Sequence, residues 1–229
     1  MTLRSIVKRM IAHSPLGYPE RLDALLRLSK LGPWVARQQP HPYFPTREQL
    51  HAHVANTVVG QQPITYLEFG VYQGASLNGW MRLNTHADSE FIGFDSFEGL
   101  PEAWVTVGRT FPRGTFDLQG QLPAVHDSRG RLIKGWFQQT LPTFMQQFES
   151  RKPLVIHCDA DLYASTLFVL CTLHEHIVPG TIVIMDDFSS MQHDFRALED
   201  YTKSFGREYQ VLGAAGPIYY EHVALRCTK

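Results

Sequence analysis

The sequence predicts an α/β fold in which a mostly parallel sheet is covered by helices on both faces. Three observations lead to this expectation. Short, nearly continuous apolar segments follow one another along the chain, helix-like segments separate most of them, and several apolar segments end in an acidic residue. Strands that are buried on both faces lose the alternation of apolar and polar residues, so this order favours parallel strands joined by helical crossovers.

The N-terminal part is predicted to be helical. Apolar residues at positions 3, 6, 7, 10 and 11 share one helix face, which indicates a core or subunit-contact helix and leaves a homo-oligomer open. A second helix is expected over residues 20–31 and is ended by Gly32-Pro33. Thr46, with Gln49 three residues later, is typical of a capping box at the start of a helix over 46–56.

The sheet is predicted to begin after this helical part. The strands are expected at residues 64–70, 91–95, 131–137, 153–159 and 181–187, with a last strand, possibly antiparallel, at 218–227. The helices are expected at residues 75–84, 138–149, 165–177 and 191–205. The stretch 96–130 is long and rich in glycine, proline and polar residues, so we interpret it as a lid or binding loop.

Composition and charge argue against several classes of protein. The 229 residues are 44% hydrophobic and 19% charged, and the net charge of −1 gives no bulk attraction to nucleic acid or to an anionic membrane. No apolar segment reaches the roughly 18–20 residues that a membrane span needs. The cysteines, Cys158, Cys171 and Cys227, have neither disulfide-like nor metal-like spacing, which favours a cytoplasmic location.

The segment YLEFGVYQGAS, residues 66–76, places Gly70 and Gly74 where the first strand gives way to a helix. The two glycines let the backbone turn sharply and pass close to a ligand. A dinucleotide-binding loop would read G-x-G-x-x-G, but position 72 is a tyrosine, so a diphosphate fits poorly. Asp95, at the end of the next strand, is placed to accept hydrogen bonds from a ribose. The pattern therefore predicts a nucleoside ligand without a diphosphate.

Further acidic residues stand where other strands end. Asp159 ends the fourth strand, Asp161 follows it on the same side, and Asp186 and Asp187 end the fifth. If these strands are neighbours, the carboxylates converge and repel one another unless a proton or a cation lies between them. Oxygen ligands suit Mg²⁺, Ca²⁺ or Mn²⁺ better than Zn²⁺. The alternative is that Asp186 or Asp187 caps the helix that follows.

Five motifs in this order resemble the macrocin O-methyltransferase family of class I S-adenosylmethionine-dependent methyltransferases: LEFGVYQGAS, GFDSFEGLPEAW, KGWFQQTLP, DADLYAST and PGTIVIMDDF. The resemblance covers about residues 45–190. It implies a Rossmann-like fold with a seven-stranded sheet, S-adenosylmethionine, and a divalent metal, usually Mg²⁺. It also implies a small-molecule acceptor with a free hydroxyl, a sugar of a glycosylated natural product above all. The chain then divides into a helical extension or acceptor-site cover, residues 1–56, and a methyltransferase domain, residues 57–229.

The resemblance also assigns roles to individual residues. The cofactor is assigned to Glu68, Gly70, Gly74 and Ser76 at its methionine end, Asp95 and Ser96 at the ribose and adenosine, Gly135 and Trp136 near the adenine, and Asp161. The metal is assigned to Asp159, Asp186 and Asp187.

The reaction expected is an in-line methyl transfer, in which the enzyme aligns the acceptor oxygen and eases its ionisation. The candidate catalytic residues are Asp159, Asp161 and His193, and the general base is left open among Asp161, His193 and His126. His157 is more typical of a buried structural histidine. Two other functions remain open, an NAD-dependent oxidoreductase and a non-catalytic nucleoside-binding module. Tyr72 argues against the first, and the cluster of acids argues against the second.

Overall fold

The computed structural model describes residues 19–106, 108–149 and 151–229. Its main sheet has eight strands in the order β1-β9-β10-β8-β7-β2-β3-β6. Their bounds are β1 (Tyr43–Phe44), β2 (Thr65–Phe69), β3 (Glu90–Asp95), β6 (Gly130–Lys134), β7 (Leu154–Cys158), β8 (Ile182–Met185), β9 (Tyr209–Ala215) and β10 (His222–Cys227). β10 runs antiparallel to both of its neighbours, and the other pairs are parallel. The parallel arrangement and the antiparallel last strand are confirmed, whereas the expected count of seven strands is wrong.

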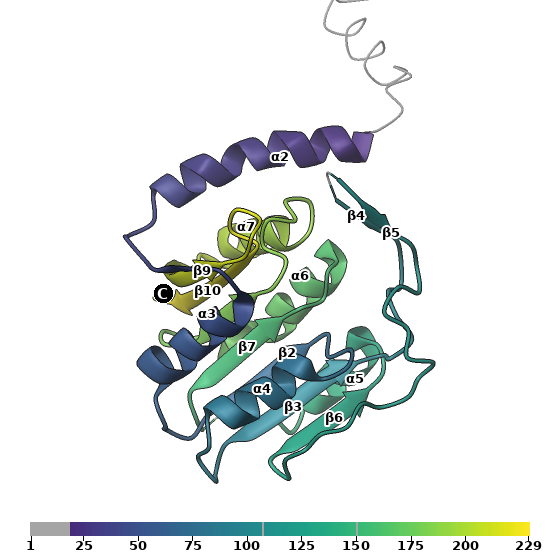
Figure 1. Cartoon of the computed structure of the whole chain (residues 1–229), viewed down its shortest axis with the longest axis vertical. Coiled ribbons are helices and arrows are strands. Elements are labelled where there is room, and N and C mark those ends of the chain that lie inside the picture. Colours follow the sequence, from purple (N-terminus) through teal and green to yellow (C-terminus); the bar gives the residue numbers. More distant parts are fainter. Residues whose placement is uncertain (1–18, 107, 150) are drawn as a thin grey trace, which may run out of the picture.

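Helices cover both faces of this sheet (Figure 1). The helical segments are α2 (Pro19–Ala36), α3 (Arg47–His53), η1 (Val54–Val59), α4 (Ala75–Leu83), α5 (Phe137–Met145), α6 (Tyr163–Thr172), η2 (His174–His176) and α7 (Asp194–Phe205). α3, η1 and α4 pack on one face through residues such as Leu50 and Trp80. α5, α6 and α7 pack on the other face through residues such as Leu141 and Phe195. Two separate apolar cores therefore hold the sheet between the two layers of helices.

The N-terminal segments agree with the prediction in part. Thr46 caps α3, since its hydroxyl accepts a hydrogen bond from the backbone N–H of Gln49 at 3.4 Å. α2, however, continues through Pro33 to Ala36, so the stop predicted at this proline is wrong. A proline inside a helix costs about 3 kcal/mol or more. Contacts of the Trp34 ring with aromatic residues of α7 and of the loop before it offset that cost. The amphipathic helix predicted before α2 lies outside the described residues.

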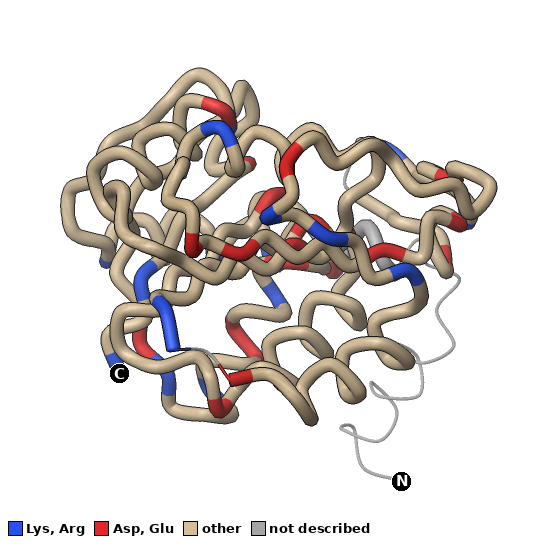
Figure 2. Tube along the Cα trace, turned by 90° about the horizontal axis from the view of Figure 1, so that it is seen from below, with Lys and Arg blue, Asp and Glu red and all other residues tan. Residues whose placement is uncertain are grey.

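The long segment predicted as a lid or binding loop carries a small hairpin of its own. β4 (Trp104–Val105) and β5 (Thr110–Phe111) pair antiparallel, apart from the main sheet (Figure 1). Lysine and arginine positions are interspersed with acidic ones along the chain trace (Figure 2). None of the helices in the described part of the chain combines the length and hydropathy that a membrane crossing requires.

Candidate functional site

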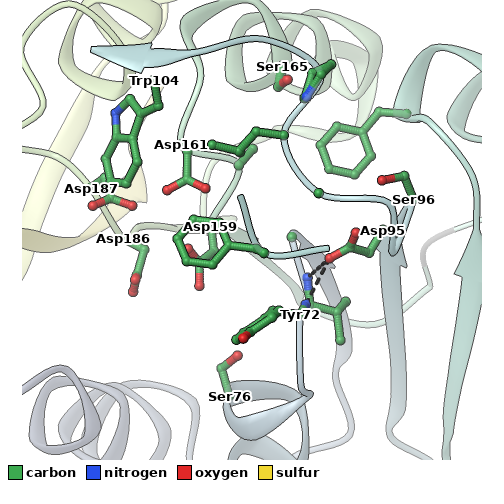
Figure 3. A pocket seen from close by; sticks show the side chains of 18 of the residues that line it. Tyr72, Ser76, Asp95, Ser96, Trp104, Asp159, Asp161, Ser165, Asp186 and Asp187 are labelled. Carbon is green, nitrogen blue, oxygen red and sulfur yellow. Dashed lines mark hydrogen bonds between the residues drawn. The ribbon is translucent and has the colours of Figure 1, made fainter. Parts of the chain in front are cut away.

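A cavity of about 450 Å³ opens beyond the carboxyl ends of β2, β3, β7 and β8. Its wall includes Arg47, Gly70, Tyr72, Ser76, Asp95, Ser96, Trp104, Trp136, Asp159, Asp161, Asp186 and Asp187. In Figure 3, Asp95 and Ser96 lie on one side of this cavity, and the four other aspartates lie on the opposite side. The cavity thus has two halves of different chemistry, and most of the residues predicted from strand ends meet there.

Asp95 holds the glycine loop in place on the first half. Its carboxylate accepts hydrogen bonds from the backbone N–H groups of Val71 and Tyr72, both at 2.8 Å (Figure 3). It also accepts one from Phe97 N–H at 2.8 Å. Gly70 has a φ of +93°, and a Cβ on it would overlap the carbonyl oxygen of Asp159. Only glycine fits this crossing, so the loop after β2 lies directly against the end of β7.

Three of the predicted cofactor residues do not line the cavity. Glu68 is fully buried beneath it and reaches it through Ser76, whose hydroxyl donates to the Glu68 carboxylate at 2.7 Å. Gly74 is the left-handed residue that precedes α4, with a φ of +77°. Gly135 donates its N–H to the Asp95 carbonyl at 2.9 Å and turns the chain toward Trp136, which does line the cavity. These three residues therefore lie behind or beside residues that line the cavity.

Three carboxylates converge on the second half. Oxygen atoms of Asp159, Asp161 and Asp187 all lie within 4.8 Å of one another. Burial, followed by the repulsion of neighbouring acids, raises the pKa of Asp159 and of Asp187 well above the ordinary value. Burial likewise raises the pKa of Asp161 to about 7. The ligand atoms that this cluster offers are all carboxylate oxygens, so its chemistry fits a hard divalent cation.

Asp186 lines the same cavity but does not belong to this group of three carboxylates. Arg47 donates to its Oδ2 at 2.8 Å, and His222 Nδ1 lies 3.2 Å from its Oδ1. Burial raises the pKa of Asp186, but hydrogen bonds from His157 and His222 outweigh that effect and hold it well below the ordinary value. The same Arg47 nitrogen is 3.6 Å from Asp159 Oδ2. A guanidinium cation therefore bridges two of the three acids that the sequence assigned to a metal.

A buried polar cluster lies behind Asp186. Tyr66 donates its hydroxyl to Glu68 at 2.7 Å, and His157 Nδ1 is 2.9 Å from the same hydroxyl oxygen. His157 Nε2 faces Asp186 Oδ1 at 3.4 Å. Burial lowers the pKa of His157, but hydrogen bonds to Asp186 and Glu68 and their charges outweigh burial and raise it to about 10. The sequence predicts that His157 is buried, but it does not indicate the contact of His157 with Tyr66 or that of Arg47 with Asp186.

The candidate base His193 does not reach the cavity. Its Nδ1 accepts a hydrogen bond from Tyr163 N–H at 3.1 Å, and its Nε2 lies 3.0 Å from the Val105 carbonyl oxygen. With both ring nitrogens in use, His193 ties the β4–β5 hairpin to the start of α6. His126 is exposed and also lies outside the cavity wall. We therefore give neither histidine a part in the chemistry.

The β4–β5 hairpin closes one side of the cavity. Trp104 stacks on Phe111 with ring centroids 4.5 Å apart, and its indole N–H donates to Ser190 Oγ at 3.2 Å. Ser190 lies in the loop between β8 and α7. This hydrogen bond, together with that between His193 and Val105, joins the lid segment to the loop that carries Asp186 and Asp187.

We expect Trp104→Phe to loosen this lid. Phenylalanine keeps an aromatic partner for Phe111 but cannot donate to Ser190, and a lost hydrogen bond of about 1 kcal/mol corresponds to a roughly fivefold shift in lid opening. Limited proteolysis followed by mass spectrometry should show about fivefold faster cleavage within residues 96–130, with an unchanged unfolding midpoint. Ser190→Ala should give the same result. Equal cleavage rates in wild type and both variants would contradict the idea that the hydrogen bond between Trp104 and Ser190 holds the lid in place.

The comparison with known proteins fits this geometry. The sequence pattern that defines the macrocin-O-methyltransferase (TylF) family matches residues 46–211. The chain belongs to this family. The resemblance drawn from the five motifs is thereby confirmed. This family member is an S-adenosylmethionine-dependent O-methyltransferase rather than an oxidoreductase or a non-catalytic module.

Curated relatives of this macrocin O-methyltransferase family member are named O-methyltransferases, and one of these names contains a rhamnosyl group. The 8-demethyl-8-(2,3-dimethoxy-alpha-L-rhamnosyl)-tetracenomycin-C 4'-O-methyltransferase of Streptomyces olivaceus is 29% identical over 71% of this chain and 67% of its own length. The demethyldecarbamoylnovobiocin O-methyltransferase of Streptomyces niveus is 25% identical over 69% of this chain and 65% of its own length. The match thus spans about two thirds of each relative.

The solved structure of the O-methyltransferase NovP shares the fold. It aligns with 80% of each chain at a TM-score of 0.59 and 23% sequence identity. The expected class I methyltransferase architecture is thereby confirmed.

Proposed function

We propose that this enzyme methylates a hydroxyl group on the sugar of a glycosylated small molecule, with the help of a hard divalent cation. The observation that carries the proposal is the convergence of Asp159, Asp161 and Asp187 in a cavity whose other half presents Asp95 and Ser96. The names of the relatives support the acceptor class, since one of them contains a rhamnosyl group. Exposed aromatic rings at the cavity, Tyr72 and Phe116, suit the aglycone of such a compound.

S-adenosylmethionine supplies the methyl group, carried on a sulfonium, when it is bound. We assign its methionine end to Gly70 and Ser76, its ribose to Asp95 and Ser96, and its adenine to the side of Trp136. Support for this placement comes from the wall itself, because all five residues line one cavity. Asp95 also fixes the glycine loop, so the residues that would hold the cofactor are positioned before it arrives.

We assign the cation to Asp159, Asp186 and Asp187. Asp159 and Asp187 belong to the group of three carboxylates whose oxygens lie within 4.8 Å of one another, and Arg47 marks a place between Asp159 and Asp186 where positive charge is bound. The cation, when bound, would lower the pKa of an acceptor hydroxyl and fix its position. Asp161 is then free to accept the hydroxyl proton, because it lines the same cavity beside these acids. Asp161→Asn should leave Mg²⁺ affinity nearly intact, whereas Asp186→Asn should weaken it.

Calorimetric titration with S-adenosylhomocysteine in magnesium buffer tests the cofactor part. We expect saturable binding to one site, because Gly70, Asp95 and Trp136 line a single cavity. Transfer of a radiolabelled methyl group to rhamnosylated aromatic compounds, and none to the corresponding aglycones, tests the acceptor part. Absence of binding heat with ligand well above micromolar concentration would refute the proposed cofactor site.

A further inference from the structure

A buried chain of polar groups runs beneath the floor of the cavity from its cofactor half to its acid half. It begins at the cavity wall with Ser76, whose hydroxyl donates to Glu68 Oε1 at 2.7 Å. The other carboxylate oxygen of Glu68 accepts from the Tyr66 hydroxyl at 2.7 Å, and that hydroxyl lies 2.9 Å from His157 Nδ1. Tyr66, Glu68 and His157 have no exposed surface.

The chain continues from His157 to the acids. His157 Nε2 lies 3.4 Å from Asp186 Oδ1, and Arg47 joins Asp186 Oδ2, at 2.8 Å, with Asp159 Oδ2, at 3.6 Å. The carboxylates of Glu68 and Asp186 only accept hydrogen bonds while they are ionised, so the donors between them point outward from His157, toward Glu68 on one side and toward Asp186 on the other. Tyr66 donates toward Glu68, and both ring nitrogens of His157 donate, one toward Tyr66 and the other toward Asp186.

The sheet fixes the middle of this chain. β2 and β7 are parallel neighbours, and Glu68 pairs in register with His157. Tyr66 lies two residues before Glu68 on β2, so the two side chains point to the same face, toward α3 and α4. Ser76 lies in the first turn of α4 on that face, and Arg47 is the first residue of α3. The ends of the chain therefore rest on helices, whereas its centre rests on strands that cannot shift independently.

A dry interior makes such a chain sensitive to either end. Hydrogen bonds are stronger in a low dielectric medium, and each polarises the next. A group that loses its partner there bears the full cost of its desolvation, so the chain favours states in which every link is made. A cation at Asp159, Asp186 and Asp187 would take the place that Arg47 holds between two of these acids. Arg47 and His157 share Asp186, so that change alters the charge around the carboxylate that His157 contacts, and through Tyr66 it alters the hydrogen bond between Glu68 and Ser76.

We infer that Tyr66 and His157 are positioning residues that couple the cofactor half of the cavity to the acid half. Filling the acid half with a divalent cation orders the chain and presents Ser76 in its binding position, so the cofactor binds more tightly. Coupling between two sites is reciprocal, and values of roughly 5- to 150-fold are common. The inference rests on the proposed function, because it assigns the two halves to cofactor and cation.

The test is calorimetry of S-adenosylhomocysteine binding with and without MgCl₂, at constant ionic strength. This ligand lacks the sulfonium charge, so direct repulsion between the methyl donor and Mg²⁺ does not enter. In wild type we expect Mg²⁺ to lower the Kd by at least about fivefold. Tyr66→Phe keeps the ring and removes the link between Glu68 and His157, so its Kd should be the same in both buffers.

A matched control comes from the opposite face of the sheet. Tyr201 is also fully buried, and its hydroxyl contacts His174 Nδ1 at 3.2 Å. Tyr201→Phe removes a part-buried hydrogen bond between a tyrosine and a histidine and should keep the wild-type ratio of Kd values. Should Tyr66→Phe not fold, Ser76→Ala at the cavity wall cuts the first link of the chain and should also abolish the ratio.

The outcomes separate the inference from the proposed function. A wild-type ratio near one, or a Tyr66→Phe ratio equal to that of wild type, overturns the coupling while cofactor binding stands. Loss of the ratio in Tyr201→Phe as well assigns the effect to general loosening and also overturns the coupling. Absence of S-adenosylhomocysteine binding in wild type under both conditions refutes the proposed function itself.

Discussion

Asp159→Asn should reduce methyl transfer by on the order of 10²–10³-fold while leaving the affinity for S-adenosylhomocysteine nearly unchanged. Asp159 is the acid that both the bridge to Arg47 and the contact with Asp187 share, so it stands at the centre of the proposed cation site. Asparagine has nearly the same size but no charge to hold a cation. The glycine loop is held by the Asp95 carboxylate and lies against the backbone of Asp159, and this variant changes neither.

The stability of Asp159→Asn separates loss of chemistry from loss of fold. Burial and neighbouring acids raise the pKa of Asp159 in the folded protein, so its ionised form destabilises the fold at any pH above the unfolded pKa. A neutral amide removes that repulsion, and the melting temperature at neutral pH should not fall. Thermal unfolding, calorimetry and single-turnover methyl transfer measure the three quantities.

Asp95→Asn is the matched counterpart in the cofactor half. One oxygen of Asp95 accepts from two backbone N–H groups of the glycine loop, and the other accepts from Phe97 N–H. The amide nitrogen of asparagine must therefore face at least one of these donors. This variant should weaken S-adenosylhomocysteine binding, whereas Asp159→Asn should not. If Asp159→Asn retained full activity in the presence of a chelator, no metal role for this residue could stand.

The acids of the site could be predicted from sequence because strand order alone brings them together. The carboxyl ends of parallel strands lie at one edge of a sheet, so Asp95, Asp159 and Asp187 lie along that edge whatever path the connecting helices take. The direction of the side chains that follow the strand ends could not be predicted in this way. His193 follows β8 closely, but packing of the β4–β5 hairpin draws its ring away to Val105. Arg47 lies at the start of α3, and no local sequence pattern predicts its contacts with Asp159 and Asp186.

The fold was predictable where the apolar signal is dense and was not where it is weak. The strands β2, β3, β7 and β8 stand out as apolar runs rich in β-branched or aromatic residues. β9 went unpredicted because its second half, Leu212 to Ala215, consists of residues with little strand preference apart from one leucine. β1 has only two residues and exists because β9 offers it an edge. Pro33 within α2 is a further case in which tertiary packing overrides a local preference.

Gly70→Ala should disable the enzyme through the backbone. The φ of +93° costs a residue with a Cβ about 1–2 kcal/mol, and here the added atom would also overlap the carbonyl oxygen of Asp159. The end of β2 and the end of β7 would have to separate, which moves the cofactor loop and Asp159 together. A displacement of about 1 Å at reacting groups can cost on the order of 10²-fold in rate. We expect losses in stability, in S-adenosylhomocysteine affinity and in turnover.

Gly180→Ala isolates the steric part of this effect. Gly180 has a similar φ of +101°, but a Cβ there would meet no atom within 4 Å. It should lose only the roughly 1–2 kcal/mol that the left-handed backbone demands, and it should bind S-adenosylhomocysteine as wild type does. Chemical denaturation and calorimetry of the two variants side by side measure the difference. Equal losses of stability, with cofactor affinity retained in both, would mean that the crossing of the glycine loop over Asp159 is not what shapes the cavity.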